Sequence, residues 1–152
     1  MKKIFLMAIL SMVLINCGSD DNAEEIFTPQ IITPILIAQS DQGGFYIPDI
    51  NPYNNYFNNE DDWNLFLEWS LPYSPTPSVF DNIDFNSDTV IVCVDYSRPT
   101  NGFSIGFNSI IEYQNEVVVS INYIDNGGIA AHPSRPFIIV KIPKTEKPIV
   151  FE

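Results

Sequence analysis

TVIVCVDY, residues 89–96, is the stretch of this sequence that decides the fold. It is a nearly continuous run of apolar and β-branched side chains, and this pattern predicts a buried β-strand. Its single cysteine, Cys93, is predicted to be a small apolar core residue, because free cysteine is among the most buried residue types. A buried strand needs neighbouring strands and a second layer, so the rest of the chain should supply both.

The chain that follows this strand carries further strand patterns and no helical pattern. We predict strands over Phe103–Phe107, Ser109–Tyr113, Glu116–Ile124, Arg135–Ile142 and Pro148–Phe151, with a tight turn at Gln114-Asn115. Because no helices lie between these strands, the sheet that they form should be largely antiparallel.

One helix is predicted before the buried strand, over Asn59–Trp69. Asn59 can cap its N-terminus, and the EDD run that follows favours the positive end of the helix dipole. Trp63, Phe66 and Leu67 then recur at helical spacing, which predicts one apolar face.

The segment before this helix is expected to contribute little regular structure. Ile31–Ala38 is apolar, but Pro34 interrupts it, which indicates an edge strand or a strand that starts late. Phe45–Phe57 is expected to be an ordered loop with one short strand. The predicted fold is therefore α+β: a single domain over residues 31–152, with one short helix against a mostly antiparallel β-sheet.

The N-terminus has the organisation of a secretory signal. Lys2 and Lys3 precede a short apolar run that ends at Cys17, and this run is too short for a membrane span. The sequence LINC, residues 14–17, resembles a lipobox, with Asn16 in place of the usual small residue. We therefore expect a lipoprotein signal peptide over residues 1–16 and lipidation of Cys17, which would anchor the chain in an envelope membrane.

Residues 17–30 are expected to form an acidic tether. The stretch GSDDNAEE, residues 18–25, is polar and has no basic residue, so it cannot build a core. Its SDD, residues 19–21, also resembles the export signal of Bacteroidetes-type surface lipoproteins. That resemblance implies an outer membrane-anchored protein exposed at the cell surface.

Charge is distributed unevenly along the chain. Residues 18–95 contain fourteen acidic residues and no Lys or Arg, whereas residues 96–152 contain five residues of each sign. Nucleic-acid binding is not expected from such a chain, because binding phosphates requires Lys and Arg.

No catalytic or metal centre is evident in the sequence. His132 is the only histidine, and Cys93 lies within a predicted strand, so neither a zinc site nor a Cys–His pair can be assembled. We expect a protein that is not an enzyme and that has no cofactor. An alternative is a glycan-binding surface lipoprotein, with Tyr46, Tyr53 and Tyr56 and the helix residue Trp63 as stacking platforms.

Residues 84–152 distantly resemble the C-terminal domain of the protease complex-subunit PrcB family. The matching features are Asp84-Phe85 before the buried strand, RPTNGFSI at residues 98–105, the strand Val117–Ile121, and PSRPFIIVKIP at residues 133–143. The helix with Trp63 resembles the one that precedes this domain in the family. The resemblance implies a secreted, non-catalytic protein that assists, stabilises or regulates a protease.

Three short motifs also resemble the loops of chagasin-type inhibitors of papain-like cysteine proteases. They are PTNG at residues 99–102, Gly127-Gly128, and RPF at residues 135–137. This resemblance implies a cysteine protease inhibitor and is kept as an alternative.

Both resemblances direct attention to the same two loops. Each loop combines Pro and Gly with an Arg and an aromatic residue, the types that anchor protein interfaces. We expect the partner to be a protease or another envelope protein. The predicted partner-binding residues are Arg98, Pro99, Thr100, Asn101, Gly102, Phe103, Gly127, Gly128, Arg135 and Phe137.

Overall fold

The computed structural model describes residues 27–48, 51–71, 78–128 and 130–152. Its elements in chain order are β1 (Gln30–Ile31), β2 (Ile35–Ser40), β3 (Tyr53–Phe57), α1 (Glu60–Ser70), the 3-10 helix η1 (Ser78–Asn82), β4 (Asp88–Val94), β5 (Phe103–Glu112), β6 (Val117–Asp125), β7 (Phe137–Pro143) and β8 (Ile149–Phe151). This content confirms the α+β class with mostly antiparallel strands and one short α-helix.

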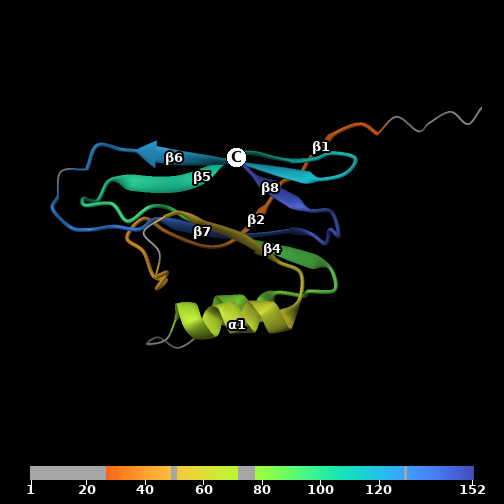
Figure 1. Ribbon diagram of the computed structural model, residues 1–152, viewed down its shortest axis with the longest axis horizontal. Coiled ribbons are helices and arrows are strands. Elements are labelled where there is room, and N and C mark those ends of the chain that lie inside the picture. The colour runs from red at the N-terminus through yellow and green to blue at the C-terminus, as the bar shows by residue number, and fades with distance from the viewer. Residues whose placement is uncertain (1–26, 49–50, 72–77, 129) are drawn as a thin grey trace, which may run out of the picture.

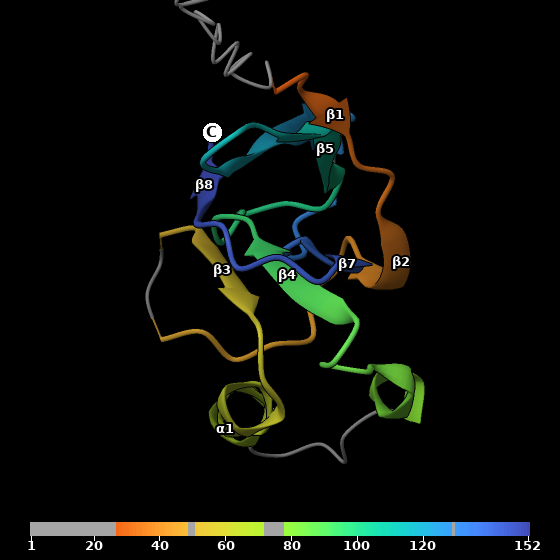
Figure 2. The ribbon, with the colours of Figure 1, turned by 90° about the vertical axis from the view of Figure 1, so that its right-hand side faces the viewer.

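The described strands form two sheets that pack face to face, and α1 covers the outside of one of them (Figures 1 and 2). The first sheet has the order β1-β5-β6-β8, and the second has the order β2-β7-β4-β3. All pairs are antiparallel except β6 with β8, which is parallel. We expected one sheet, so the division into two is the main difference from the sequence prediction.

The two central strands of the second sheet, β7 and β4, are buried on both faces, which explains the apolar run in β4. Alternate side chains of a strand point to opposite faces. Ile91 and Cys93 therefore join the core between the sheets, while Val90, Val92 and Val94 join the core under α1. All five are at most 1% exposed. A strand with water on one face would have alternated apolar and polar residues instead.

Helix α1 starts and packs as the sequence predicts. The Asn59 side chain accepts a hydrogen bond from the amide of Asp62 at 2.8 Å, which caps the first turn. Trp63, Phe66 and Leu67 are buried against the second sheet. Phe66 stacks on Tyr53 with ring centroids 5.7 Å apart, so the helix is held beside β3 by aromatic contacts.

Several expected element boundaries shift. The strands predicted over Phe103–Phe107 and Ser109–Tyr113 are one strand, β5, with an irregularity in its pairing between Phe107 and Ser109. The described domain begins before residue 31, because Gln30 already pairs with Glu112. β2 begins at Ile35, after Pro34, and lies at a sheet edge, which confirms that prediction.

The two ends of the sandwich carry different parts of the chain. The loops that join β4 to β5 and β6 to β7 lie together at the left end in Figure 1. The chain enters at the other end, where β1 pairs with the last two residues of β5, Ile111 and Glu112. Phe27 is held there with its ring centroid 4.4 Å from the Lys147 ammonium.

Candidate functional site

The two loops singled out in the sequence are in direct backbone contact. Gly102 has a φ of +89°, and a Cβ built on it would lie 2.2 Å from the backbone nitrogen of Gly128. A Cβ on Gly128 would lie 2.0 Å from the carbonyl oxygen of Asn101. Both positions therefore require glycine, because any side chain would drive the two loops apart.

Hydrogen bonds join the same loops along their length. Arg98 and Ser134 form a two-way backbone bridge, with N–H to O distances of 2.8 and 3.0 Å. The hydroxyl of Ser134, which is buried, donates to the carbonyl of Thr100 at 2.8 Å. Asn101 binds Ala130 through both its backbone amide and its side-chain oxygen. The pair of loops is thus one preorganised unit.

A buried ion pair anchors this unit to the end of β4. The carboxylate of Asp95 accepts two hydrogen bonds from the guanidinium of Arg98, both at 2.9 Å, and one from the amide of Tyr96 at 2.6 Å. The Asp95 side chain is 1% exposed and that of Arg98 is 27% exposed. The hydrogen bonds to Asp95 raise the pKa of Arg98 above its ordinary value, so the cation is permanent.

The guanidinium of Arg98 also lies between two aromatic rings. Its central carbon is 4.7 Å from the ring centroid of Phe103 and 5.3 Å from that of Tyr96. Tyr96 in turn lies 6.4 Å from Tyr123 of β6, centroid to centroid. Tyr96 is 46% exposed and Tyr123 is 38% exposed, so this aromatic group reaches the solvent.

Arg135 and Phe137 do not belong to this exposed group. The guanidinium of Arg135 donates to the backbone carbonyls of Ile47, Asn51 and Asp95, at 2.7 to 3.1 Å. Phe137 is buried and packs edge-on against Phe45, 4.7 Å between centroids.

This placement corrects the predicted contact set. Arg135 and Phe137 hold the loop of residues 41–48 in place, so we remove both from the contact surface. The Arg-Pro-aromatic motif that resembles a chagasin loop is therefore not presented to solvent, since Pro136 is buried as well.

We use the name double-loop surface for the exposed atoms of residues 96–103, 123–128 and 130–134. It contains Arg98, Pro99, Thr100, Asn101, Gly102, Phe103, Gly127 and Gly128 from the predicted set. It adds Tyr96, which follows β4, and Tyr123, near the end of β6; the sequence prediction missed both because it assigned them to strands and not to the loops. Burial is the largest cause that raises the pKa of Tyr123, and a hydrogen bond with the Asn54 side chain acts in the opposite direction.

The single histidine and the buried cysteine, which were considered for a Cys–His pair, lie in different settings. His132 is exposed on the β6–β7 loop, and Cys93 is fully buried between the sheets. Burial raises the pKa of the Cys93 thiol to about 12. Within the described residues, no three His, Cys, Asp or Glu side chains are grouped so that they could hold a metal ion.

The four aromatic residues of the glycan alternative are not presented together. Trp63 is 2% exposed and lies in the core under α1. Tyr53 and Tyr56 are half-buried, and Tyr46 is 60% exposed. Trp63 is therefore unavailable as a stacking platform in this conformation.

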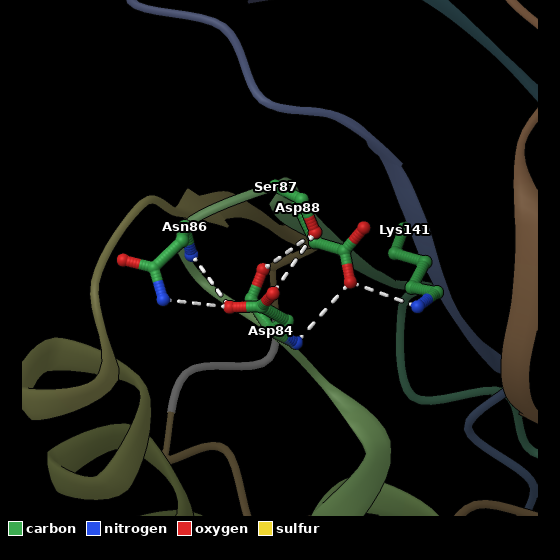
Figure 3. Close-up of polar contacts among 5 residues, drawn as sticks. All are labelled: Asp84, Asn86, Ser87, Asp88 and Lys141. Atoms are coloured by element: carbon green, nitrogen blue, oxygen red, sulfur yellow. Dashed lines mark hydrogen bonds and ion pairs between the residues drawn. The ribbon is translucent and has the colours of Figure 1, made fainter.

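A second polar cluster lies in the turn before β4 and has a structural role (Figure 3). The Asp84 carboxylate accepts from the amide and the side chain of Asn86, at 3.0 and 2.8 Å. Asp88 accepts from the Asp84 amide at 3.2 Å and from the Lys141 ammonium at 2.8 Å. These bonds close the turn and tie it to β7, and the bond from the Asn86 amide is the largest cause that lowers the pKa of Asp84.

The predicted signal peptide, Cys17 and most of the acidic tether lie outside the described residues. No helix in the described part of the chain has both the length and the hydrophobicity needed to cross a membrane. Comparison with family models, with curated proteins and with solved structures found no match to this chain.

Proposed function

We propose that this protein is a lipid-anchored, non-catalytic binding protein of the cell envelope, which contacts its partner through the double-loop surface. The observation that carries the proposal is the position of this surface relative to the incoming chain. β1 lies beside the last residues of β5, whereas the double-loop surface surrounds its first residue, Phe103. The ten residues of β5 separate these ends by roughly 30 Å.

A lipid on Cys17 would therefore attach the domain to the membrane at the end opposite the double-loop surface, so the attachment would not cover that surface. Phe27 and Lys147 fix the point where the tether meets the domain. The ammonium of Lys147 also pairs with Glu112 at 2.8 Å, so this point is tied to β5 itself. The geometry suits a protein that presents a surface to partners beyond its own membrane.

The chemistry of the double-loop surface suits a protein partner. Tyrosine and arginine are the residue types most often found at the centre of interfaces, and here Tyr96, Tyr123 and Arg98 lie together. The contact between Gly102 and Gly128 fixes the loops before binding, so less conformational entropy is lost when a partner docks. A protease is the partner class that the resemblance to PrcB implies.

Site-specific crosslinking in the native envelope tests this proposal. A photoreactive phenylalanine analogue at position 96 or 123 is expected to capture one defined protein. The matched control is position 113, because Tyr113 is also 38% exposed but lies on the hairpin at the other end of β5. Capture of the same protein from position 113, or of none from positions 96 and 123, would refute the assignment.

Alanine substitution of the same two tyrosines is the second test of this proposal. Tyr96→Ala combined with Tyr123→Ala should release the captured protein, while Tyr113→Ala should retain it. Each alanine removes an aromatic side chain of the kind that commonly contributes more than ~2 kcal/mol at the centre of an interface.

The anchor is tested separately by detergent phase separation. The unaltered protein is expected in the detergent phase, and Cys17→Ser is expected in the aqueous phase or retained with its signal uncut. Recovery of the unaltered protein in the aqueous phase would contradict lipidation.

A further inference from the structure

A cleft of about 460 Å³ lies between α1 and the connection from η1 to β4, on the side of the second sheet that α1 covers (Figure 2). One wall belongs to α1, where Glu60, Trp63 and Asn64 share a helix face because residues three and four apart are neighbours. The other wall is the turn over residues 83–86. The cleft is separate from the double-loop surface and has the size of a small-molecule site.

The indole N–H of Trp63 is a buried donor without an acceptor. The Trp63 side chain is 2% exposed and packs against the rings of Phe66 and Phe80, each 5.4 Å away between centroids. No described residue accepts a hydrogen bond from this N–H. Buried indole N–H groups usually have a partner. Because Trp63 lines the cleft, a bound molecule can supply the missing acceptor.

The rim of the cleft supplies acceptors. Glu60 is exposed, and its carboxylate forms no hydrogen bond or ion pair with another described residue. On the opposite wall, Oδ1 of Asp84 accepts from Asn86, but its Oδ2 accepts only from the Ser87 hydroxyl, at 3.4 Å. A carboxylate oxygen can accept two hydrogen bonds, so both carboxylates can bind donors of a ligand. Asn64, which is exposed and has no partner among the described residues, can donate or accept.

These groups together select the chemistry of a ligand. It must accept a hydrogen bond from Trp63, and it must donate hydrogen bonds to Glu60 and Asp84. An ammonium group has no acceptor, and an ionised carboxylate has no donor and would be repelled by the two acidic residues. A hydroxyl group both donates and accepts. Ile83 and Phe85, which flank Asp84 in the chain and are half-buried, add an apolar surface for the C–H groups of a ring.

We propose that this cleft binds a neutral sugar. One ring hydroxyl accepts a hydrogen bond from the Trp63 indole N–H, other hydroxyls donate to Glu60 and Asp84, and the ring packs against Phe85. This contact differs from the stacking on Trp63 that the glycan-binding alternative assumed, because the N–H group and not the ring face meets the sugar. The site depends neither on lipidation nor on the double-loop surface.

Heteronuclear NMR of the indole N–H groups, on the whole chain in a detergent that carries no sugar, tests this proposal. The protein has two tryptophans, and only Trp63 lines the cleft, so the Trp69 signal is an internal control. Maltose and cellobiose are the neutral probes, and glucuronate and putrescine are the charged ones. At least one disaccharide is expected to shift the Trp63 signal and not that of Trp69. Both charged probes are expected to bind at least about tenfold more weakly.

Two variants locate the site, and a third assigns the signals. Glu60→Ala removes an acceptor for a sugar hydroxyl and should weaken disaccharide binding by about tenfold or more. Asp61→Ala is the matched control, because Asp61 is an exposed acidic residue of the same helix turn that does not line the cleft. Trp69→Phe identifies the Trp63 signal without altering the cleft. Circular dichroism checks that the variants keep the fold.

Three results would overturn the proposal. They are an unshifted Trp63 signal with both disaccharides, binding of glucuronate or putrescine at least as tight as that of the disaccharides, and equal losses in Glu60→Ala and Asp61→Ala. The first two are read on the unaltered protein, so they hold even if a variant does not fold. Loss of crosslinking at the double-loop surface would leave all three measurements unchanged.

Discussion

The guanidinium of Arg98 donates two hydrogen bonds, both 2.9 Å long, to the carboxylate of Asp95, which is fully buried at the end of β4. The pair is asymmetric, because the Arg98 side chain remains 27% exposed while that of Asp95 is 1% exposed. Arg98 thus serves two purposes at once. It neutralises a buried charge of the fold, and it holds Tyr96 and Phe103 in the double-loop surface.

The asymmetry predicts unequal costs for removing the two partners. Arg98→Met leaves a buried carboxylate without its cation and should lower the free energy of unfolding by about 3 kcal/mol or more. Asp95→Asn should cost less, since a neutral amide can still accept from the Tyr96 amide and Arg98 can turn to water. Urea denaturation of both variants measures the difference. A larger loss for Asp95→Asn would show that the burial of the charge is not what Arg98 compensates.

The contact between Gly102 and Gly128 predicts a strong effect of one methyl group. Gly102→Ala combines a positive φ with a Cβ 2.2 Å from the Gly128 nitrogen, so it should destabilise the fold by about 2 kcal/mol or more. Gly106→Ala, in β5, is the matched control, because an added Cβ there meets no other atom within 4 Å beyond its chain neighbours. Thermal unfolding compares the two. Similar melting temperatures would mean that the loops are not in contact in solution.

The burial of Cys93 predicts that its thiol does not react while the protein is folded. Burial raises its pKa to about 12, so in a protein carrying Cys17→Ser a disulfide reagent at pH 8 should label Cys93 only after unfolding in urea. Rapid labelling without denaturant would place this thiol outside the core.

A hydroxyl at position 93 should be poorly tolerated between the sheets. Cys93→Ser is expected to be less stable than Cys93→Ala by about 1–3 kcal/mol, because the serine hydroxyl is buried in an apolar core. Denaturant unfolding measures both variants. If the two variants have equal free energies of unfolding, the serine hydroxyl must have a hydrogen-bond partner in the folded state.

The turn in Figure 3 predicts a pH effect with a definite sign. The pKa of Asp84 lies below its ordinary value of 3.8, chiefly through the Asn86 amide. The folded state therefore binds this proton less tightly than the unfolded chain. The resulting stabilisation is present above pH 3.8 and is lost as the pH falls through the lower, folded-state pKa.

Carboxyl NMR of Asp84 tests this with two variants. Asn86→Ala removes the side-chain donor and keeps the backbone donor, so the pKa of Asp84 should rise towards 3.8 without reaching it. Asn115→Ala, in the β5–β6 turn, should leave it unchanged. An unshifted pKa in Asn86→Ala would assign the whole effect to the backbone.

Local patterns determined the elements of this fold and part of the candidate surface. Asn59 followed by three acidic residues specifies a helix start whatever packs on it, and the run before Asp95 specifies a buried strand. The glycines at 102, 127 and 128 and the adjacent Arg98 marked the two loops that meet at one end. The two loops meet because β4 pairs with β7 and β5 pairs with β6, so that both connections run between the two sheets at the same end.

Other features depended on contacts between residues far apart in the sequence. The strand patterns do not encode which strands pair, so one sheet and two sheets are equally compatible with them. The side chains of β4 alternate between two cores, and this required a second sheet on one side of the strand and α1 on the other. Arg98 and Arg135 looked alike as loop arginines, but only the fold buried the nearby Asp95 carboxylate beside Arg98 and placed three backbone carbonyls around Arg135.

The sequence by itself therefore determined the local structure: which segments are strands, where the helix begins, and which loops carry glycine and arginine. Hydrophobic period, capping and turn chemistry act over a few residues, so they can be read without the fold. Only the tertiary structure decided the exposure of each side chain. Tyr96 and Tyr123 reach solvent and Phe137 does not, because burial depends on neighbours up to a hundred residues away, such as Phe45 against Phe137.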